Sequence, residues 1–339
     1  MRKLAFLLYD NRSGSTLLSA LLSERAGVAV SHETDLVPAV LEVPARRGVL
    51  GVSELVAYLY TETRFAELAL DRETVAAALR RQGETLSREA ALHALVRHYF
   101  ETHAPEAEAW VVKGPRLHYH LDALATVFPE ATMLHLVRDG RAVFRSKRTT
   151  PSGYALRTGE QDVMDADLVR AACNWQRKID LVDAFDGLPV ATTRYEDVLT
   201  DAEAALAGIL ETLGVSESGR ERSGTRAAFV EHQIGHSYHD LHTNVAGDLN
   251  PAKAVQWQRD LRPAEIEAYE ALAGGALDRY GYERLAEAES GVWQQARLLG
   301  LRLRREGRRW AALGRAMRRG DAVRLLRGKA FEWKARRSA

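Results

Sequence analysis

Four short apolar runs, each followed by a helical pattern, limit the fold of this 339-residue sequence more than any other feature. The runs are residues 4–9, 110–113, 133–137 and 189–193. Strands that alternate with helices build βαβ units, so the sequence predicts an α/β fold, a three-layer sandwich with a mainly parallel central sheet. Ligands of such sheets bind at the carboxyl ends of the strands, where Arg12, Arg138 and Arg194 are expected. The apolar fraction of 46% is enough to fill a core of this size.

The charge of the chain is divided unevenly along its length. Residues 290–339 carry fifteen Lys or Arg and three acidic residues, so the total of +1 leaves −11 for residues 1–289. We expect a body over residues 1–289, with a helical insertion at residues 53–109, and a basic amphipathic helical tail over residues 290–339. The tail suits an anionic membrane surface, and packing on the acidic body is the alternative. The acidic body argues against a nucleic-acid partner.

The expected location is the cytoplasm, with peripheral association at the inner face of the membrane through the tail. The apolar stretch that follows Arg2 and Lys3 is too short for the hydrophobic region of a signal peptide, and no run approaches about 18 apolar residues. The single cysteine, Cys173, excludes an intrachain disulfide and fits a reducing compartment. The sequence specifies no oligomeric state.

The segment between the first strand and the first helix is typical of a phosphate or sulfate site. It reads R-S-G-S-T-L over residues 12–17, a Gly and three hydroxyl residues before a helical pattern. Backbone N–H groups at a helix N-terminus bind such anions. The segment lacks the first Gly and the Lys of the G-x-x-x-x-G-K-[ST] motif, so ATP hydrolysis is not expected. The alternative is a plain strand-to-helix turn in which Ser15 or Thr16 caps the helix.

The same segment carries a resemblance to a known family. N-R-S-G-S-T-L-L, residues 11–18, resembles the 5′-phosphosulfate loop of PAPS-dependent sulfotransferases, in particular the bacterial carbohydrate type, with Asn11 where the family commonly has Pro. The resemblance implies a P-loop NTPase-like sulfotransferase fold and PAPS (3′-phosphoadenylyl sulfate) as co-substrate, with no metal. It assigns the phosphosulfate end of the donor to Arg12, Ser13, Gly14, Ser15, Thr16 and Leu17.

A second segment resembles the 3′-phosphate motif of the family, a strand that ends in Arg with a Ser eight residues later. It reads L-H-L-V-R-D-G-R-A-V-F-R-S over residues 134–146. Arg138 and Ser146 carry over directly, and the two side chains can bind one phosphate. Asp139 is expected to cap the next helix, and Gly140 stands where the family often has Pro. A basic residue from a later loop closes this site in the family, and Lys253 is the candidate here.

Further segments follow the order of the family along the first 283 residues. They are K-G-P at residues 113–115, T-R-Y-E-D-V-L at 193–199, Trp257 with Leu261, and Y-G-Y at 280–282. Each is weak alone. Their order strengthens the resemblance, because independent coincidences would not fall in the correct sequence.

Sulfuryl transfer to a hydroxyl requires a base for the proton and positive charge near the leaving oxygen. The bacterial proteins that the chain resembles place a glutamate 21 residues after the loop Arg, which corresponds to Glu33, and Arg12 then stabilises the developing charge. An ordinary surface or capping role for Glu33 is the alternative. Among the histidines that compete for the base role, His118 is the best placed, ahead of His32 and His120.

The resemblance implies in-line transfer from PAPS to a hydroxyl of a carbohydrate, a glycolipid or a similar acceptor. A small natural-product alcohol is the alternative acceptor, and a non-sulfotransferase nucleotide-binding protein on the same fold is the alternative function. Four histidines recur at near-helical spacing, but without Cys partners or an H-E-x-x-H pattern they do not predict zinc. They are His232, His236, His239 and His242.

Overall fold

The computed structural model describes residues 2–25, 27–33, 35–43, 49–63, 65–149, 167–216, 245 and 248–285. Two compact units divide the chain: residues 1–138 with 181–255 form the first, and residues 139–180 with 256–339 form the second. The predicted tail and the four spaced histidines lie outside the described residues. Within the described ranges, no helix is both long and apolar enough to cross a bilayer.

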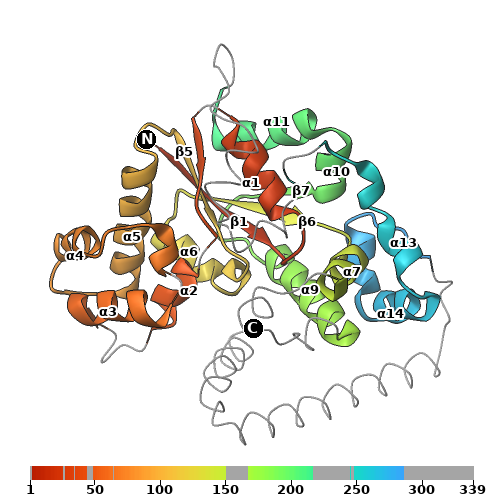
Figure 1. The fold of residues 1–339 in the computed structure, drawn as a ribbon, viewed down its shortest axis with the longest axis horizontal. Coiled ribbons are helices and arrows are strands. Elements are labelled where there is room, and N and C mark those ends of the chain that lie inside the picture. Colours follow the sequence, from red (N-terminus) through yellow and green to blue (C-terminus); the bar gives the residue numbers. More distant parts are fainter. Residues whose placement is uncertain are drawn as a thin grey trace, which may run out of the picture. The chain divides into compact units, whose positions relative to one another are not determined.

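The first unit is built on a five-stranded sheet in which all pairings are parallel (Figure 1). In spatial order its strands are β2 (Val28–Val30), β5 (Ala109–Lys113), β1 (Lys3–Tyr9), β6 (Thr132–Val137) and β7 (Val190–Arg194). The four predicted strands are confirmed to within one residue at each end, whereas the three-residue β2 was not predicted. Because every strand is parallel to its neighbours, all carboxyl ends lie at one edge of the sheet.

Alternate side chains of β1 join the two layers that cover the sheet. The helices that cover the sheet in this unit are α1 (Ser15–Ser23), α2 (Leu36–Leu41), α3 (Val52–Glu62), α4 (Arg72–Arg80), α5 (Arg88–His103), α6 (Leu121–Val127), α10 (Tyr195–Thr200) and α11 (Ala202–Leu213). Phe6 and Leu8 pack into one cluster with α2–α6, while Ala5, Leu7 and Tyr9 pack into another with α1, α10 and α11. The predicted three-layer α/β sandwich is therefore confirmed.

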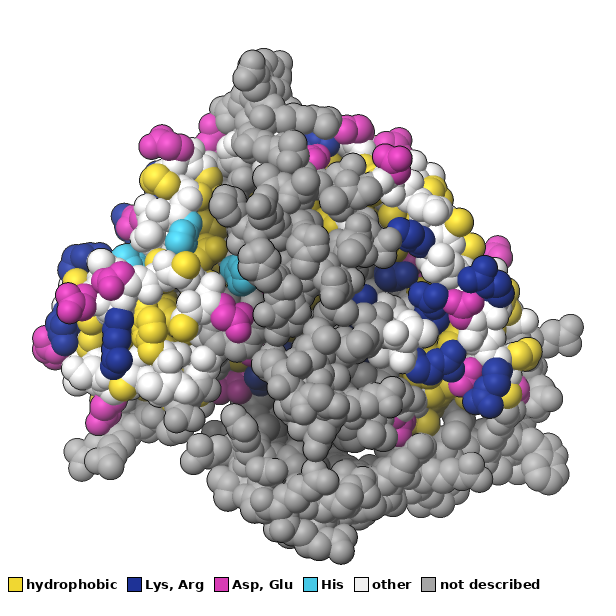
Figure 2. Space-filling view, viewed as in Figure 1, with side chains coloured by type: hydrophobic (Ala, Val, Ile, Leu, Met, Phe, Trp, Pro, Cys, Tyr) yellow, Lys and Arg dark blue, Asp and Glu magenta, His cyan; other side chains and the backbone are white. Residues whose placement is uncertain are grey.

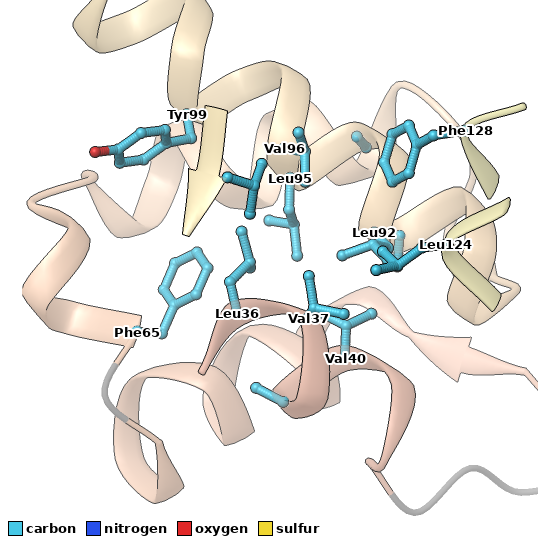
Figure 3. Close-up of a cluster of buried hydrophobic side chains, with 14 of the residues drawn as sticks. Leu36, Val37, Val40, Phe65, Leu92, Leu95, Val96, Tyr99, Leu124 and Phe128 are labelled. Atoms are coloured by element: carbon cyan, nitrogen blue, oxygen red, sulfur yellow. The ribbon is translucent and has the colours of Figure 1, made fainter. Parts of the chain in front are cut away.

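The chain between β2 and β5 is mainly helical and carries its own packing. Leu36 and Val37 of α2 face Leu95 and Val96 of α5 (Figure 3). The side chain of Ser87 accepts a hydrogen bond from a first-turn N–H and so begins α5. A short antiparallel pair, β3 (Leu50–Gly51) with β4 (Thr85–Leu86), and the 3₁₀ turn η1 (Phe65–Leu68) complete the segment. That residues 53–109 form an insertion stays a prediction.

Charges of both signs cover this helical segment. Basic and acidic side chains are interspersed over α3–α5 on the face shown in Figure 2. Two ion pairs join residues four apart, Arg80 with Glu84 and Arg97 with Glu101. The segment therefore presents no surface of a single sign in that view.

The second unit contains four described helices around a small aromatic core. They are α7 (Gly140–Thr149), α9 (Leu168–Asp183, whose last three residues belong to the first unit), α13 (Gln256–Asp260) and α14 (Pro263–Arg279). The buried rings of Phe144, Trp175 and Tyr269 pack together. Ion pairs from Arg145 to Asp260 and from Arg148 to Glu265 hold α7 against α13 and α14.

Candidate active site

Three arginines gather where parallel strands end in the first unit. Arg12 follows β1 by three residues, Arg138 follows β6 directly, and Arg194 is the last residue of β7. The three strands are neighbours in the sheet, and Val137 pairs with Arg194 in the β6–β7 register. Sequence reasoning predicted this edge, and the strand order brings the side chains to it.

The loop after β1 turns sharply before α1 begins. Arg12 and Gly14 both have positive φ angles, 72° and 87°. Gly14 occupies the N-cap position of α1 without a side-chain cap, and Ser15 begins the helix. The alternative in which Ser15 or Thr16 caps the helix is therefore wrong, because both lie inside its first turn. The N–H groups of that turn have no acceptor within the helix and are suited to an anion.

Tyr195, the first residue of α10, holds the loop in place. A Cβ built on Gly14 would overlap the Tyr195 ring, so only glycine allows the ring to lie against the loop. The guanidinium of Arg138 lies 4.4 Å from the centre of the same ring. Arg138 also donates a hydrogen bond from Nη1 to the carbonyl oxygen of Arg12, at 2.9 Å. Loop, ring and arginine thus form one packed group.

The charges around Arg12 favour an anion. Burial lowers the pKa of Arg12, and the positive charge of Arg138 lowers it further, whereas Glu33 and Tyr195 act in the opposite direction. Two half-buried guanidinium groups that repel each other at a helix N-terminus gain free energy when a negatively charged group lies between them. The arrangement can therefore bind a phosphate or a sulfate.

Glu33 lies beyond the end of β2 and is held by residues from β1 and β5. The hydroxyl of Tyr9 donates to Glu33 Oε2 at 2.6 Å, and Lys113 Nζ lies 3.8 Å from the same oxygen. Burial lowers the pKa of Lys113, and the charge of Glu33 opposes that shift. The electrostatic interaction between Glu33 and Arg12 also places this carboxylate near the loop. Sequence reasoning predicted Glu33 but not its two partners.

The competing histidines have other surroundings. His118 lies on the 3₁₀ turn η2 (Leu117–Tyr119) and is only 2% exposed, with its ring 6.0 Å from that of His135. His120 Nε2 lies 3.2 Å from an oxygen of Glu42. The backbone N–H of His32 donates to the hydroxyl of Tyr99. The His118 side chain is buried, whereas the Glu33 side chain is 37% exposed.

Lys253 lies on a turn that packs against α10, the helix whose first residue, Tyr195, contacts the loop after β1. It ends the 3₁₀ turn η4 (Pro251–Lys253), which begins with a cap from the Asn250 side chain and packs against α10. Since α10 begins with Tyr195, the half-buried Lys253 belongs to the same part of the first unit as the loop. Its role at a phosphate stays a prediction.

The remaining predicted residues belong to the second unit. Ser146 is 8% exposed on α7. Asp139 accepts a hydrogen bond from the N–H of Arg141 at 2.8 Å, so its predicted capping of α7 is confirmed. Its carboxylate also pairs with the Arg141 guanidinium, which contacts Glu270 and lies 3.9 Å from the centre of the Trp257 ring. Trp257 is thus part of a structural cluster here.

Sequence reasoning gave no role in the site to two residues, although Lys113 was part of the K-G-P segment and each carried a signal. Lys113 is a lone charge at the end of an apolar strand, and Tyr9 is a hydroxyl-bearing ring directly before the loop. Both positions are buried in the structure, where a polar group needs a partner. Among the described residues, no group of three or more His, Cys, Asp or Glu side chains could hold a metal ion.

Comparison with known proteins gives three findings. A model of the sulfotransferase family matches residues 8–218. The chain is 27% identical over 166 residues to carbohydrate sulfotransferase 4 of Mus musculus, covering 44% of this chain and 41% of the relative. It is 25% identical over 179 residues to an omega-hydroxy-beta-dihydromenaquinone-9 sulfotransferase of Mycobacterium bovis, covering 51% of this chain and 41% of the relative. The chain thus spans about two fifths of the length of either curated relative.

A solved structure has a similar fold. The sulfotransferase domain of the Synechococcus PCC 7002 olefin synthase aligns with a TM-score of 0.54 and 21% identity, over 84% of this chain and 97% of that domain. At this identity the likeness concerns the fold alone. The segment matched by the family model contains the loop, Glu33, Lys113 and Arg138.

Proposed function

Because the chain belongs to the sulfotransferase family, whose model matches residues 8–218, we propose that it is a PAPS-dependent enzyme that sulfates a hydroxyl group. The observation that carries the proposal is the pair of half-buried guanidinium groups, Arg12 and Arg138, at the N-terminus of α1. Such a pair of cations at a helix N-terminus fits a donor that carries several anionic groups.

The residues of the loop have separate roles in this proposal. The first-turn N–H groups of α1 and the side chains of Ser13, Ser15 and Thr16 bind the phosphosulfate end of PAPS. PAPS supplies the activated sulfuryl group, which passes to the acceptor oxygen as the bond to the nucleotide phosphate breaks and 3′,5′-ADP leaves. Arg12 stabilises the negative charge on the leaving oxygen, and Glu33 accepts the proton of the acceptor hydroxyl. The low exposure of His118 is the reason to prefer Glu33.

The nucleotide is recognised in this proposal by its 3′-phosphate. Arg138, Ser146 and Lys253 are assigned to that group from the sequence resemblance. A 3′-phosphate distinguishes PAPS from ATP, so these residues would decide which nucleotide binds. Lys253 gains support from its place on η4, next to the helix that carries Tyr195.

Binding calorimetry of the full chain with 3′,5′-ADP and with 5′-AMP tests the donor assignment. We expect 3′,5′-ADP to bind at least about tenfold more tightly, and Arg138→Ala to remove most of that difference. Arg97→Ala, an exposed arginine paired with Glu101, is the matched control and should bind as the wild type does. Equal affinity for the two nucleotides would contradict the proposal and favour another nucleotide-binding function.

The acceptor is proposed to be a hydroxyl of a carbohydrate, a glycolipid or a similar molecule, with a small natural-product alcohol as the alternative. The names of the curated relatives support a hydroxyl-bearing acceptor, since one is a carbohydrate sulfotransferase and the other acts on an omega-hydroxy-dihydromenaquinone. Incubation of the chain with ³⁵S-labelled PAPS and an extract of the source cells, followed by identification of the labelled product, decides between them. A labelled product whose sulfate is not an ester of a hydroxyl would contradict both.

Peripheral membrane association through residues 290–339 is proposed from the charge of that segment, fifteen basic residues against three acidic ones. Sedimentation with vesicles that contain phosphatidylserine compares the full chain with a chain that ends at Gly291. We expect the full chain to sediment and the shorter one to stay in the supernatant at low salt. Equal partitioning would overturn the membrane proposal and leave the sulfotransferase proposal untouched.

A further inference from the structure

Tyr9 is a buried phenol that contacts the candidate base. It ends β1, is 1% exposed, and donates its hydroxyl proton to Glu33 Oε2 at 2.6 Å. Its ring packs with α1 and α10 on one face of the sheet. A purely apolar ring would fill that position without the cost of burying a hydroxyl, so the hydroxyl is retained for its bond to the carboxylate.

We propose that Tyr9 is a positioning residue that holds the carboxylate of Glu33 ionised and fixed in orientation for the acceptor proton. The inference rests on the proposed function, in which Glu33 is the base. It adds a residue that acts through Glu33 rather than on the substrate. A carboxylate has about four lone-pair sites, so a bond from Tyr9 does not use up its capacity to accept a proton.

Tyr9 suits this role because its own proton is retained. Burial raises the pKa of Tyr9 well above 10, and the negative charge of Glu33 raises it further. The phenol is therefore a permanent donor and does not compete with Glu33 as a base. By reciprocity, a neutral donor at 2.6 Å stabilises the charged form of the carboxylate.

Lys113 complements the phenol from the neighbouring strand. Its Nζ lies 3.8 Å from the oxygen that Tyr9 contacts, and its side chain is only 5% exposed, compared with 37% for Glu33. A single hydrogen bond lets the bonded oxygen move about its donor. A second contact to the same oxygen from another strand restricts that movement, so Glu33 Oε2 is held from β1 and β5 together.

The same phenol connects the base with the donor loop. The Ser15 hydroxyl forms a hydrogen bond that lowers the pKa of Tyr9, opposite to the effect of Glu33. Ser15 is the first residue of α1 and belongs to the loop assigned to the donor. Tyr9 therefore lies between a donor-binding residue and the base, which fixes the base relative to the loop.

Tyr9→Phe in the full chain tests the inference, because it keeps the ring and removes only the hydroxyl. We follow the ¹³C carboxyl resonance of Glu33, assigned with Glu33→Gln, through a pH titration without any nucleotide. In Tyr9→Phe the carboxylate should become protonated at a pH about 1 unit higher than in the wild type. Tyr60→Phe removes another hydrogen-bonded phenol, one that donates to Leu70, and should leave the titration unchanged.

An unchanged or downward-shifted titration in Tyr9→Phe would overturn the inference. If Tyr9→Phe does not fold, we compare the ¹³Cζ resonance of Tyr9 in the wild type and in Glu33→Gln instead. The resonance should shift when the charge of Glu33 is removed. An unchanged resonance would overturn the proposal. Calorimetry with 3′,5′-ADP keeps the two proposals separate. If the wild type does not bind 3′,5′-ADP, the proposed donor site is wrong and the inference about Tyr9 is not affected. The carboxyl titration of Glu33 tests only the role of Tyr9.

Discussion

At the scale of single residues, the loop after β1 depends on one glycine. Gly14 has a φ of 87° and lies under the ring of Tyr195, so both its backbone conformation and its lack of a side chain are required. Arg12 adopts a similar left-handed conformation at 72°, which costs a residue with a side chain about 1 kcal/mol. Strain of this kind is typical of binding loops.

Gly14→Ala should disrupt the loop. The left-handed conformation costs alanine about 1–2 kcal/mol, and the new methyl group displaces the Tyr195 ring that supports Arg138. We expect the affinity for 3′,5′-ADP, measured by calorimetry, to fall at least about tenfold. Gly208→Ala in α11 is the control, because nothing lies within 4 Å of its added Cβ. Equal affinities in the two variants would show that Tyr195 and Gly14 do not shape the site.

Residue types, but not their contacts, could be predicted in this site. Arg12 and Gly14 follow from the local pattern of a loop before a helix, and Glu33 was predicted from its offset in the family that the sequence resembles. The contacts of Tyr9 and Lys113 with Glu33 join β1, β5 and the end of β2, whose adjacency depends on strand order. No local pattern reports that order. The support of Gly14 by Tyr195, 181 residues later, is hidden for the same reason.

At the scale of elements, the beginning of α7 is packed as tightly as the beginning of α1. A Cβ on Gly140 would lie 2.7 Å from Trp175 and closer still to the Tyr269 hydroxyl. Asp139 caps the helix and pairs with the buried Arg141. A proline at position 140, which the resembling family often has, would meet the same two rings. The departure from the family pattern therefore has a packing cause within the second unit.

Gly140→Ala should destabilise this unit by about 1–3 kcal/mol, because the Trp175 and Tyr269 rings must move to admit the methyl group. Gly275→Ala in α14 meets nothing within 4 Å and should instead stabilise its helix by about 0.5–1 kcal/mol. Urea denaturation of both variants measures the two changes. Shifts of the same sign would contradict the packing explanation.

The elements that the sequence predicted share a property that β2 lacks. Runs such as residues 4–9 and 133–137 are long enough to show continuous apolar character, which buried parallel strands require. β2 has three residues and is a strand because it pairs with β5 at the edge of the sheet. Short strands defined by pairing cannot be told from a loop by periodicity.

At the scale of the whole molecule, charge sets the conditions under which the fold persists. In the second unit the buried Arg141 pairs with the carboxylates of Asp139 and Glu270. The first unit holds a buried histidine within its sheet. His135 lies on β6 and is 2% exposed, with its ring against that of His118.

Burial lowers the pKa of His135 from 6.5 to about 4, and the charge of Asp183 only partly opposes the shift. The unfolded chain binds a proton near pH 6.5 and the folded chain does not until about pH 4, so stability is intact above pH 6.5 and falls between these values. A shift of this size corresponds to about 3 kcal/mol.

His135→Gln cannot titrate, and its free energy of unfolding in urea should decline less than that of the wild type between pH 6.5 and 4. His93→Gln, at an exposed position, should decline as the wild type does. Parallel declines in all three proteins would show that His135 binds its proton at the same pH in the folded and the unfolded chain.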